Sequence, residues 1–148
     1  MPRDPLVIPP GEGPTFEARG SRMTFKATAA TTAGAFSLME RELPPGGRRP
    51  PPHVHTAAER HSSCSRAQSS WCWNGQVARL EPRGFALVPR GSAHSFGNAG
   101  TGPARVLVLH APAMDPYFRE LEALWSGPAA PTAEAELALM RRHGTEPA

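Results

Sequence analysis

Short apolar or alternating stretches, separated by turn residues, occupy most of the chain up to residue 112. Period-two alternation and short apolar runs bounded by turn signals are typical of strands. On this basis we expect strands at residues 6–8, 22–28, 34–43, 76–80, 85–89 and 104–110, with turns at 81–84 and 98–102. The pattern predicts a mainly β domain.

Helical signals replace the strand pattern near the end of the chain. Asp115 at the N-cap and Pro116 at the first helical position predict a helix that continues to Trp125. Thr132 then caps a second helix with an apolar stripe, and Gly144 ends it. We therefore expect an all-β fold with C-terminal helices. The stripe either covers the strands or forms a dimer contact, and the sequence leaves both open.

Three histidines and one glutamate have spacings that suit a single metal centre. Side chains alternate along a strand, so His53 and His55 point to the same face, and Glu59 needs a short bend to join them. A turn at residues 89–91 delivers His94 from another strand. Mixed imidazole and carboxylate ligation suits one divalent transition metal ion, such as iron, manganese, nickel, copper or zinc. Histidines of the core or surface are the alternative.

The same residues resemble the two motifs of the cupin superfamily. The first motif matches Gly47, five residues, His53-Val-His55, three residues and Glu59; the second matches residues 89–98, Pro-Arg-Gly-Ser-Ala-His-Ser-Phe-Gly-Asn. The resemblance covers residues 35–112 and is closest to single-domain type-2 cupins like the quercetin dioxygenases. It implies a small antiparallel β-barrel of the jelly-roll type with the ligands inside. These ligands would be His53, His55, Glu59 and His94.

A single domain is expected, because 148 residues bury one core and leave little for a second. We divide it into N-terminal strands at 1–34, the cupin barrel at 35–112 and a helical extension at 113–148. Two residues depart from the cupin pattern. Arg83 stands where a glycine usually opens the second motif, and Arg66 replaces the glycine expected after Glu59.

The second departure belongs to a larger anomaly at residues 60–73. This segment holds both cysteines, two of the three tryptophans and five of the ten serines, and its polar residues do not alternate. It occupies the place where the barrel needs a hydrophobic strand pair. Incidental thiols are the expected state of Cys64 and Cys72, while a disulfide or a zinc site with His61 matches no known spacing.

A local double frameshift would explain the anomaly. A permitted GC-rich codon choice, with two bases dropped after Glu59 and one before Asn74, gives Ala-Leu-Phe-Val-Leu-Glu-Gly-Ala-Val-Glu-Leu-Val-Leu. This shifted segment reads as strand, turn and strand, restores the missing glycine, and runs into a predicted Asn74-Gly75 turn. A genuine divergent loop is the alternative. The bases of the gene across this segment would decide between them.

Charge and targeting signals restrict the partners. The formal net charge of +3 becomes −1 with the shifted segment, because two arginines leave and two glutamates enter. Lys26 is the only lysine, and no basic stripe with interleaved aromatic residues is present, so nucleic-acid binding is disfavoured. No apolar run has signal or membrane length, which favours a cytoplasmic protein without membrane contact.

Two classes of function follow from the resemblance. In the first, the metal acts on a small oxygenated organic molecule as a dioxygenase or an isomerase, with Glu59 as the base by analogy with quercetin-dioxygenase-like cupins. In the second, the barrel is a non-catalytic binding or sensing module, because a fold does not decide an activity. An impaired product of a frameshifted gene is a third alternative, and a homodimer is expected. His110, at a strand end, is expected to be a tolerated histidine rather than a cavity group.

Overall fold

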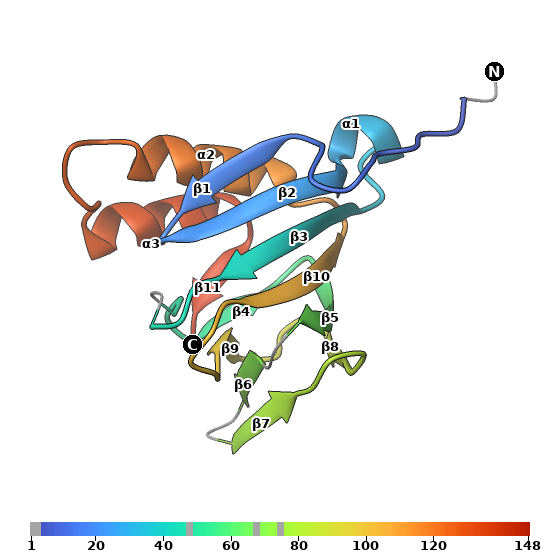
Figure 1. Ribbon diagram of the computed structural model, residues 1–148. Coiled ribbons are helices and arrows are strands. Elements are labelled where there is room, and N and C mark those ends of the chain that lie inside the picture. The colour runs from blue at the N-terminus through green and yellow to red at the C-terminus, as the bar shows by residue number, and fades with distance from the viewer. Residues whose placement is uncertain (1–3, 47–48, 67–68, 74–75) are drawn as a thin grey trace.

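Two antiparallel sheets with helices at one end form the computed structural model, which describes residues 4–46, 49–66, 69–73 and 76–148 (Figure 1). The six-stranded sheet has the order β1-β2-β3-β10-β5-β8, and the five-stranded sheet has the order β11-β4-β9-β6-β7. The elements are β1 (Thr15–Ala18), β2 (Ser21–Ala27), α1 (Ala29–Thr32), β3 (Ser37–Leu43), β4 (His53–His55), β5 (Glu59–Arg66), β6 (Ser69–Trp73), β7 (Gln76–Leu80), β8 (Phe85–Val88), β9 (His94–Asn98), β10 (Ala104–Ala111), α2 (Asp115–Trp125), α3 (Ala133–Arg142) and β11 (Thr145–Pro147).

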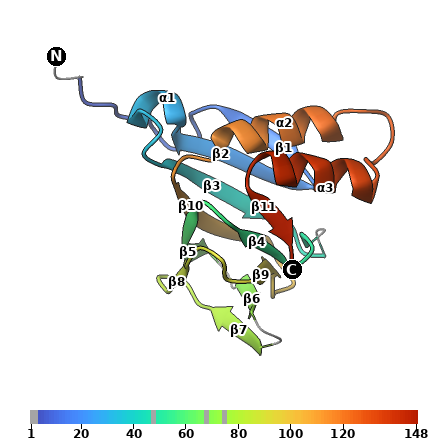
Figure 2. The same ribbon diagram turned by 180° about the vertical axis from the view of Figure 1, so that it is seen from behind.

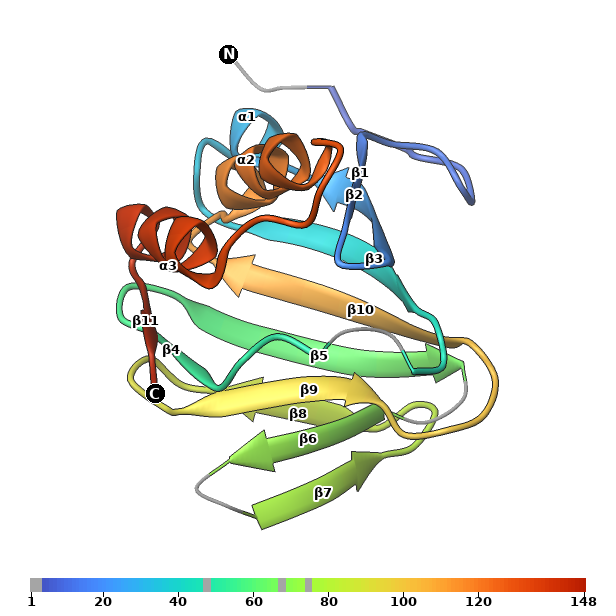
Figure 3. The same ribbon diagram turned by 90° about the vertical axis from the view of Figure 1, so that its left-hand side faces the viewer.

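The core lies between the sheets and extends under the helices. Strand β10 shows why these residues form a strand in a barrel wall, since its buried and partly exposed positions alternate from Ala104 to Ala111. Val106 and Val108 are fully buried. Helix α2 covers the β1–β2 end, where the rings of Phe25 and Phe118 lie 5.8 Å apart (Figure 3). Helix α2 thus packs on the barrel.

Most predicted strands are confirmed with small shifts of their ends. Residues 76–80 coincide with β7, while β2, β3, β8 and β10 begin or end within a few residues of their predicted ranges. The predicted strand at 6–8 is wrong: these residues form no strand, and Leu6 and Val7 are exposed. The pattern missed two short strands, β1 and β11. The second pairs with β4 beside the chain's C-terminus (Figure 2).

The two helices are confirmed, but the role of Asp115 is corrected. Met114 is the N-cap of α2, and Asp115 is the first helical residue. The Asp115 carboxylate instead accepts a hydrogen bond of 2.7 Å from the backbone N–H of Ala29, so it connects α2 to α1. Thr132 caps α3 as expected, because its hydroxyl accepts from Ala135 N at 3.1 Å.

The anomalous segment forms strands where it is described. Residues 60–66 belong to β5 and residues 69–73 to β6, so the described part forms strands rather than a loop, and the frameshift stays a prediction. Burial alternates along β5 although polarity does not, and Arg60, Ser62 and Cys64 face the interior. The barrel therefore has polar side chains at interior positions here. The predicted motif start at Gly47 and the Asn74-Gly75 turn lie outside the described residues.

Candidate metal centre

Three of the predicted ligands meet inside the barrel. His53 and His55 project from one face of β4, and His53 is the cross-strand partner of His94 on β9. Their ring centroids are 4.4 Å apart for His53 and His94, 4.9 Å for His53 and His55, and 5.1 Å for His55 and His94. One nitrogen of each ring lies within 4.8 Å of the others. All three side chains are buried, so the sequence correctly predicted the meeting of these histidines.

Each imidazole is held by a hydrogen bond at Nδ1. His53 Nδ1 donates to the Pro51 carbonyl at 2.8 Å, and His94 Nδ1 donates to the Ser92 carbonyl at 2.9 Å. His55 Nδ1 lies 3.1 Å from the Thr145 hydroxyl. A carbonyl oxygen only accepts, so the proton of a neutral ring at His53 or His94 is on Nδ1 and the Nε2 lone pair is open. Outer contacts of this kind orient metal-binding histidines.

Two of the Nε2 atoms in the cluster are buried without a hydrogen-bond partner in the described part of the chain. Among the described residues, Nε2 of His55 and Nε2 of His94 have no hydrogen-bond partner. A buried polar nitrogen without a partner costs free energy, which a metal ion bound at that nitrogen removes. The orphaned nitrogens and the fixed rings therefore fit a bound transition metal ion, although they do not define which one.

The site keeps its histidines neutral. Burial, with a smaller effect from the neighbouring imidazole of His94, lowers the pKa of His53 to about 3. Burial and His53 lower the pKa of His55 to about 2, and burial and Arg60 lower the pKa of His94 to about 4. Protons therefore compete weakly with a metal ion for these nitrogens at neutral pH.

Glu59 is the predicted ligand that the structure does not bring to the histidines. Its side chain is 46% exposed, and its carboxylate lies 3.6 Å from His61 Nε2 on the outer side of β5. Arg60, the next residue, takes the interior position and is 2% exposed. Neighbouring side chains on a strand face opposite ways, so Glu59 and Arg60 cannot both point inward in this register.

His110 is an interior residue that the sequence pattern did not favour. The side chain is fully buried, and its ring centroid lies 5.6 Å from that of His55. Neither ring nitrogen has a hydrogen-bond partner among the described residues. Burial is the main cause that lowers its pKa, followed by the charge of Arg60. The interior thus holds a fourth neutral imidazole next to the three clustered ones, rather than a histidine tolerated at a strand end.

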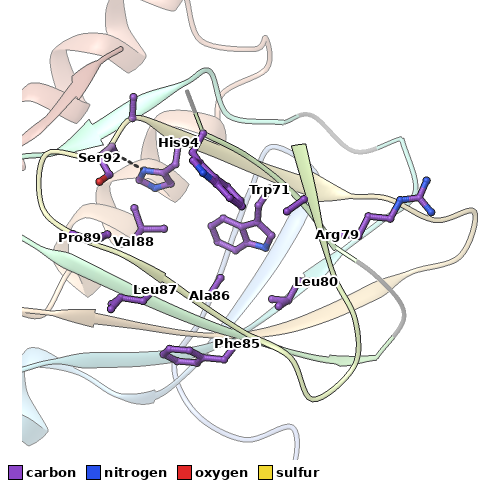
Figure 4. Close-up of a pocket in the computed structure, with 13 residues that line it drawn as sticks. Trp71, Arg79, Leu80, Phe85, Ala86, Leu87, Val88, Pro89, Ser92 and His94 are labelled. Atoms are coloured by element: carbon purple, nitrogen blue, oxygen red, sulfur yellow. Dashed lines mark hydrogen bonds between the residues drawn. The ribbon is translucent and has the colours of Figure 1, made fainter. Parts of the chain in front are cut away.

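A pocket of about 410 Å³ opens beside His94 (Figure 4). The Trp71 indole stacks toward the His94 ring, with centroids 6.5 Å apart and planes at 20°. Leu80, Phe85 and Val88 contribute apolar walls. A mostly apolar pocket of this size with a polar end suits a small organic molecule. The pocket therefore gives a ligand access to one of the three clustered histidines.

Comparison with known proteins supports a cupin domain in this chain. Residues 39–110 match the cupin domain. The chain is 28% identical over 123 residues to quercetin 2,3-dioxygenase of Bacillus subtilis (strain 168), an alignment that covers 83% of this chain and 36% of the relative. The chain contains a type-2 cupin domain, as its motifs predicted, and it spans little more than a third of this relative's length.

Solved structures agree on the fold. KdgF from a Halomonas species aligns with a TM-score of 0.64 and 15% identity over 76% of this chain and 98% of that chain. A sugar phosphate isomerase of the cupin superfamily from Silicibacter pomeroyi aligns with a TM-score of 0.55 and 18% identity over 67% of this chain and 68% of that chain. The predicted jelly-roll cupin fold is confirmed. Across the described residues, no helix has the length and apolar character to cross a membrane.

Proposed function

We propose that the protein binds one divalent transition metal ion through His53, His55 and His94 and acts on a small oxygenated organic molecule in the pocket beside His94. The observation that carries this proposal is the convergence of three buried imidazoles, each with a hydrogen-bond partner at Nδ1. Three protein ligands leave coordination positions for water or substrate. The similarity to a dioxygenase and the structural likeness to an isomerase support the two reaction classes predicted from the sequence.

The metal would supply Lewis acidity toward a bound oxygen atom, or a site for reaction with O2. The protein's own residues bind and orient. The Pro51 and Ser92 carbonyls hold two rings in place, and the apolar walls around Trp71 exclude water and position the organic part of the substrate. Glu59 as a fourth ligand and base remains a prediction from the cupin motif.

An impaired protein is the alternative that a specific observation favours. Arg60, Ser62 and Ser69 occupy interior positions of β5 and β6, where a barrel usually buries apolar side chains. Burying polar groups in place of apolar ones costs part of the small stability of a domain. A frameshifted segment would therefore leave the metal centre present in a weakened barrel.

Metal content tests the proposal. Elemental analysis of the purified protein is compared with a His53→Ala, His94→Ala double variant, and circular dichroism confirms that both are folded. A His61→Ala variant is the matched control, because His61 lies on the outer side of β5 beside Glu59. We expect one metal ion for each parent and control chain and none for the double variant. A folded parent without metal would refute the proposed centre and favour a binding or sensing module.

We also propose a homodimer and a cytoplasmic location. Val77, on β7, is a large apolar side chain that is 69% exposed and does not line the pocket beside His94, so a second copy could cover it without closing the pocket. Light scattering after size exclusion measures the mass in solution. A monomer at micromolar concentration would contradict the dimer, and fractionation of cells would test the location.

A further inference from the structure

A second, much smaller cavity lies against two of the clustered histidines. It measures about 20 Å³, and His53 and His55 form part of its wall. Three arginines, Arg19, Arg41 and Arg60, also line it, and no acidic residue is among the described residues around it. A volume of this kind holds roughly one or two water-sized atoms. The cavity is therefore a small, basic compartment next to the proposed metal centre.

The guanidinium groups in this cavity are incompletely bonded. Arg60 Nε donates to Ser62 Oγ at 3.4 Å, its guanidinium lies 3.9 Å from the Phe96 ring centre, and its Nη2 has no hydrogen-bond partner among the described residues. Arg41 Nε donates to Ser21 Oγ at 2.7 Å. These neutral contacts orient the planar groups and leave their charges unbalanced.

A carboxylate of the protein neutralises one of the three arginines, Arg19. Glu136 lies 3.3 Å from Arg19 Nε and also accepts a hydrogen bond from the Trp125 indole, while Arg19 Nη2 has no partner among the described residues. Burial, with the charge of Arg19, lowers the pKa of Arg41 to about 10, so Arg41 stays charged at neutral pH. Buried unpaired charges are strongly unfavourable unless an opposite charge joins them.

We propose that this cavity binds a carboxylate group of the substrate, with Arg41 and Arg60 as its anion-binding residues. The small volume admits the two oxygens of a carboxylate, and arginine forms paired hydrogen bonds to that group. A substrate that spans the histidines would place its carboxylate here and its reacting part at the metal. The substrate class is then a carboxylate compound, and this part of the inference rests on the proposed metal centre.

Only one of the two arginines lies in the anomalous segment. Arg60 lies in the segment 60–73, for which a frameshift is predicted, whereas Arg41 lies on β3 outside it. A variant of Arg41 therefore tests the anion site whatever the origin of the segment.

The test measures anion binding to the metal-free protein in chloride-free buffer, so that metal coordination does not contribute. Acetate is titrated calorimetrically against its neutral analogue acetamide and against inorganic phosphate. The variants are Arg41→Met and, as the matched control, Arg22→Met, whose arginine is exposed on β2. We expect acetate to bind, acetamide not to bind, Arg41→Met to weaken acetate binding by about tenfold or more, and Arg22→Met to leave it unchanged.

A second measurement separates binding from a structural role. Because Arg41→Met removes a buried charge, we expect it to melt no lower than the parent when no anion is present. A lower melting temperature would show that Arg41 supports the fold and would overturn the proposal, as would equal binding of acetate and acetamide. Tighter binding of phosphate would also overturn the carboxylate assignment. Metal content is measured separately, so a protein that holds metal but ignores acetate refutes this inference alone.

Discussion

Strands β4 and β9 and strands β5 and β6 all place polar side chains in the barrel, but the surroundings of these side chains differ. On β4 and β9, His53, His55 and His94 each have a partner at Nδ1, and one nitrogen of each ring gathers at a common point. On β5 and β6, Ser62 and Ser69 are also buried, but their hydroxyls bond to two different side chains, Arg60 and Trp71, rather than gathering at one point. The difference teaches that burial of polar groups alone does not indicate a site. Fixed orientation and convergence do.

Replacing residues 60–73 with the shifted segment is expected to give the largest effect, a rise in the melting temperature. Its sequence puts phenylalanine at the position of Ser62 and leucine at that of Cys64, both of which face the interior. Each such burial stabilises by about 1.5–3 kcal/mol, so several together should raise the melting temperature by roughly 10 °C or more. Thermal unfolding followed by circular dichroism measures the change.

A matched control changes the outer face of β5. Replacing His61 by leucine and Ser63 by valine adds apolar residues where the side chains are partly exposed, and should change stability by less than about 0.5 kcal/mol. An equal or lower melting temperature for the shifted segment would refute the idea that residues 60–73 weaken the barrel.

The histidine cluster predicts an acid-sensitive metal-free protein. The pKa values of His53, His55 and His94 are lowered from 6.5 to about 3, 2 and 4, so the unfolded chain binds more protons below pH 6.5. Stability is therefore fully present above that pH and is lost as pH falls. At about pH 5.5 each of these three histidines costs about 1.4 kcal/mol, or roughly 4 kcal/mol together, and His110, whose pKa burial also lowers, adds to the loss.

Urea unfolding of the metal-free protein at about pH 7.5 and about pH 5.5 measures this loss. The His53→Ala, His94→Ala variant is the control and should lose about half as much, since His55 and His110 remain. An equal loss in the control would mean that other groups cause the acid sensitivity, and would separate the cluster from the stability of the barrel.

The contact between Thr145 and His55 tests whether fixed orientation of a histidine supports metal binding. Its hydroxyl is the partner of His55 Nδ1 at 3.1 Å, and Thr145 itself is buried on β11. Thr145→Val keeps the shape and removes this contact, so we expect metal affinity to fall by about 10- to 100-fold, with little change in folding. Metal titration against a chelator measures it. The control Thr56→Val alters a threonine outside the cluster, and unchanged affinity in Thr145→Val would show that β11 does not position His55.

The sequence predicted the H-x-H pair because its geometry is local: alternate side chains on one strand share a face. The meeting with His94 is not local, because it depends on the pairing of β4 with β9, and the resemblance to the cupin motifs indicated it. Thr145 could not be predicted, since β11 is a three-residue strand with no periodic signal and its pairing with β4 is set by tertiary packing. The inward position of Arg60 was missed for another reason. A one-residue change of register exchanges the two faces of a strand, and the pattern of residues 60–73 does not fix that register.

Replacement of Glu59 is expected to have the smallest effect on metal binding, and it tests the register of β5. Because its carboxylate is half exposed and lies beside His61, we expect Glu59→Gln to keep the full metal content and to change metal affinity by less than about threefold, as for a distant surface charge. The His53→Ala, His94→Ala variant gives the value for a lost site in the same elemental analysis. Loss of metal in Glu59→Gln would require Glu59 to face the histidines and Arg60 to leave the interior. The register of β5 would then differ by one residue in the metal-bound protein, and Arg60 would no longer be available to the anion site.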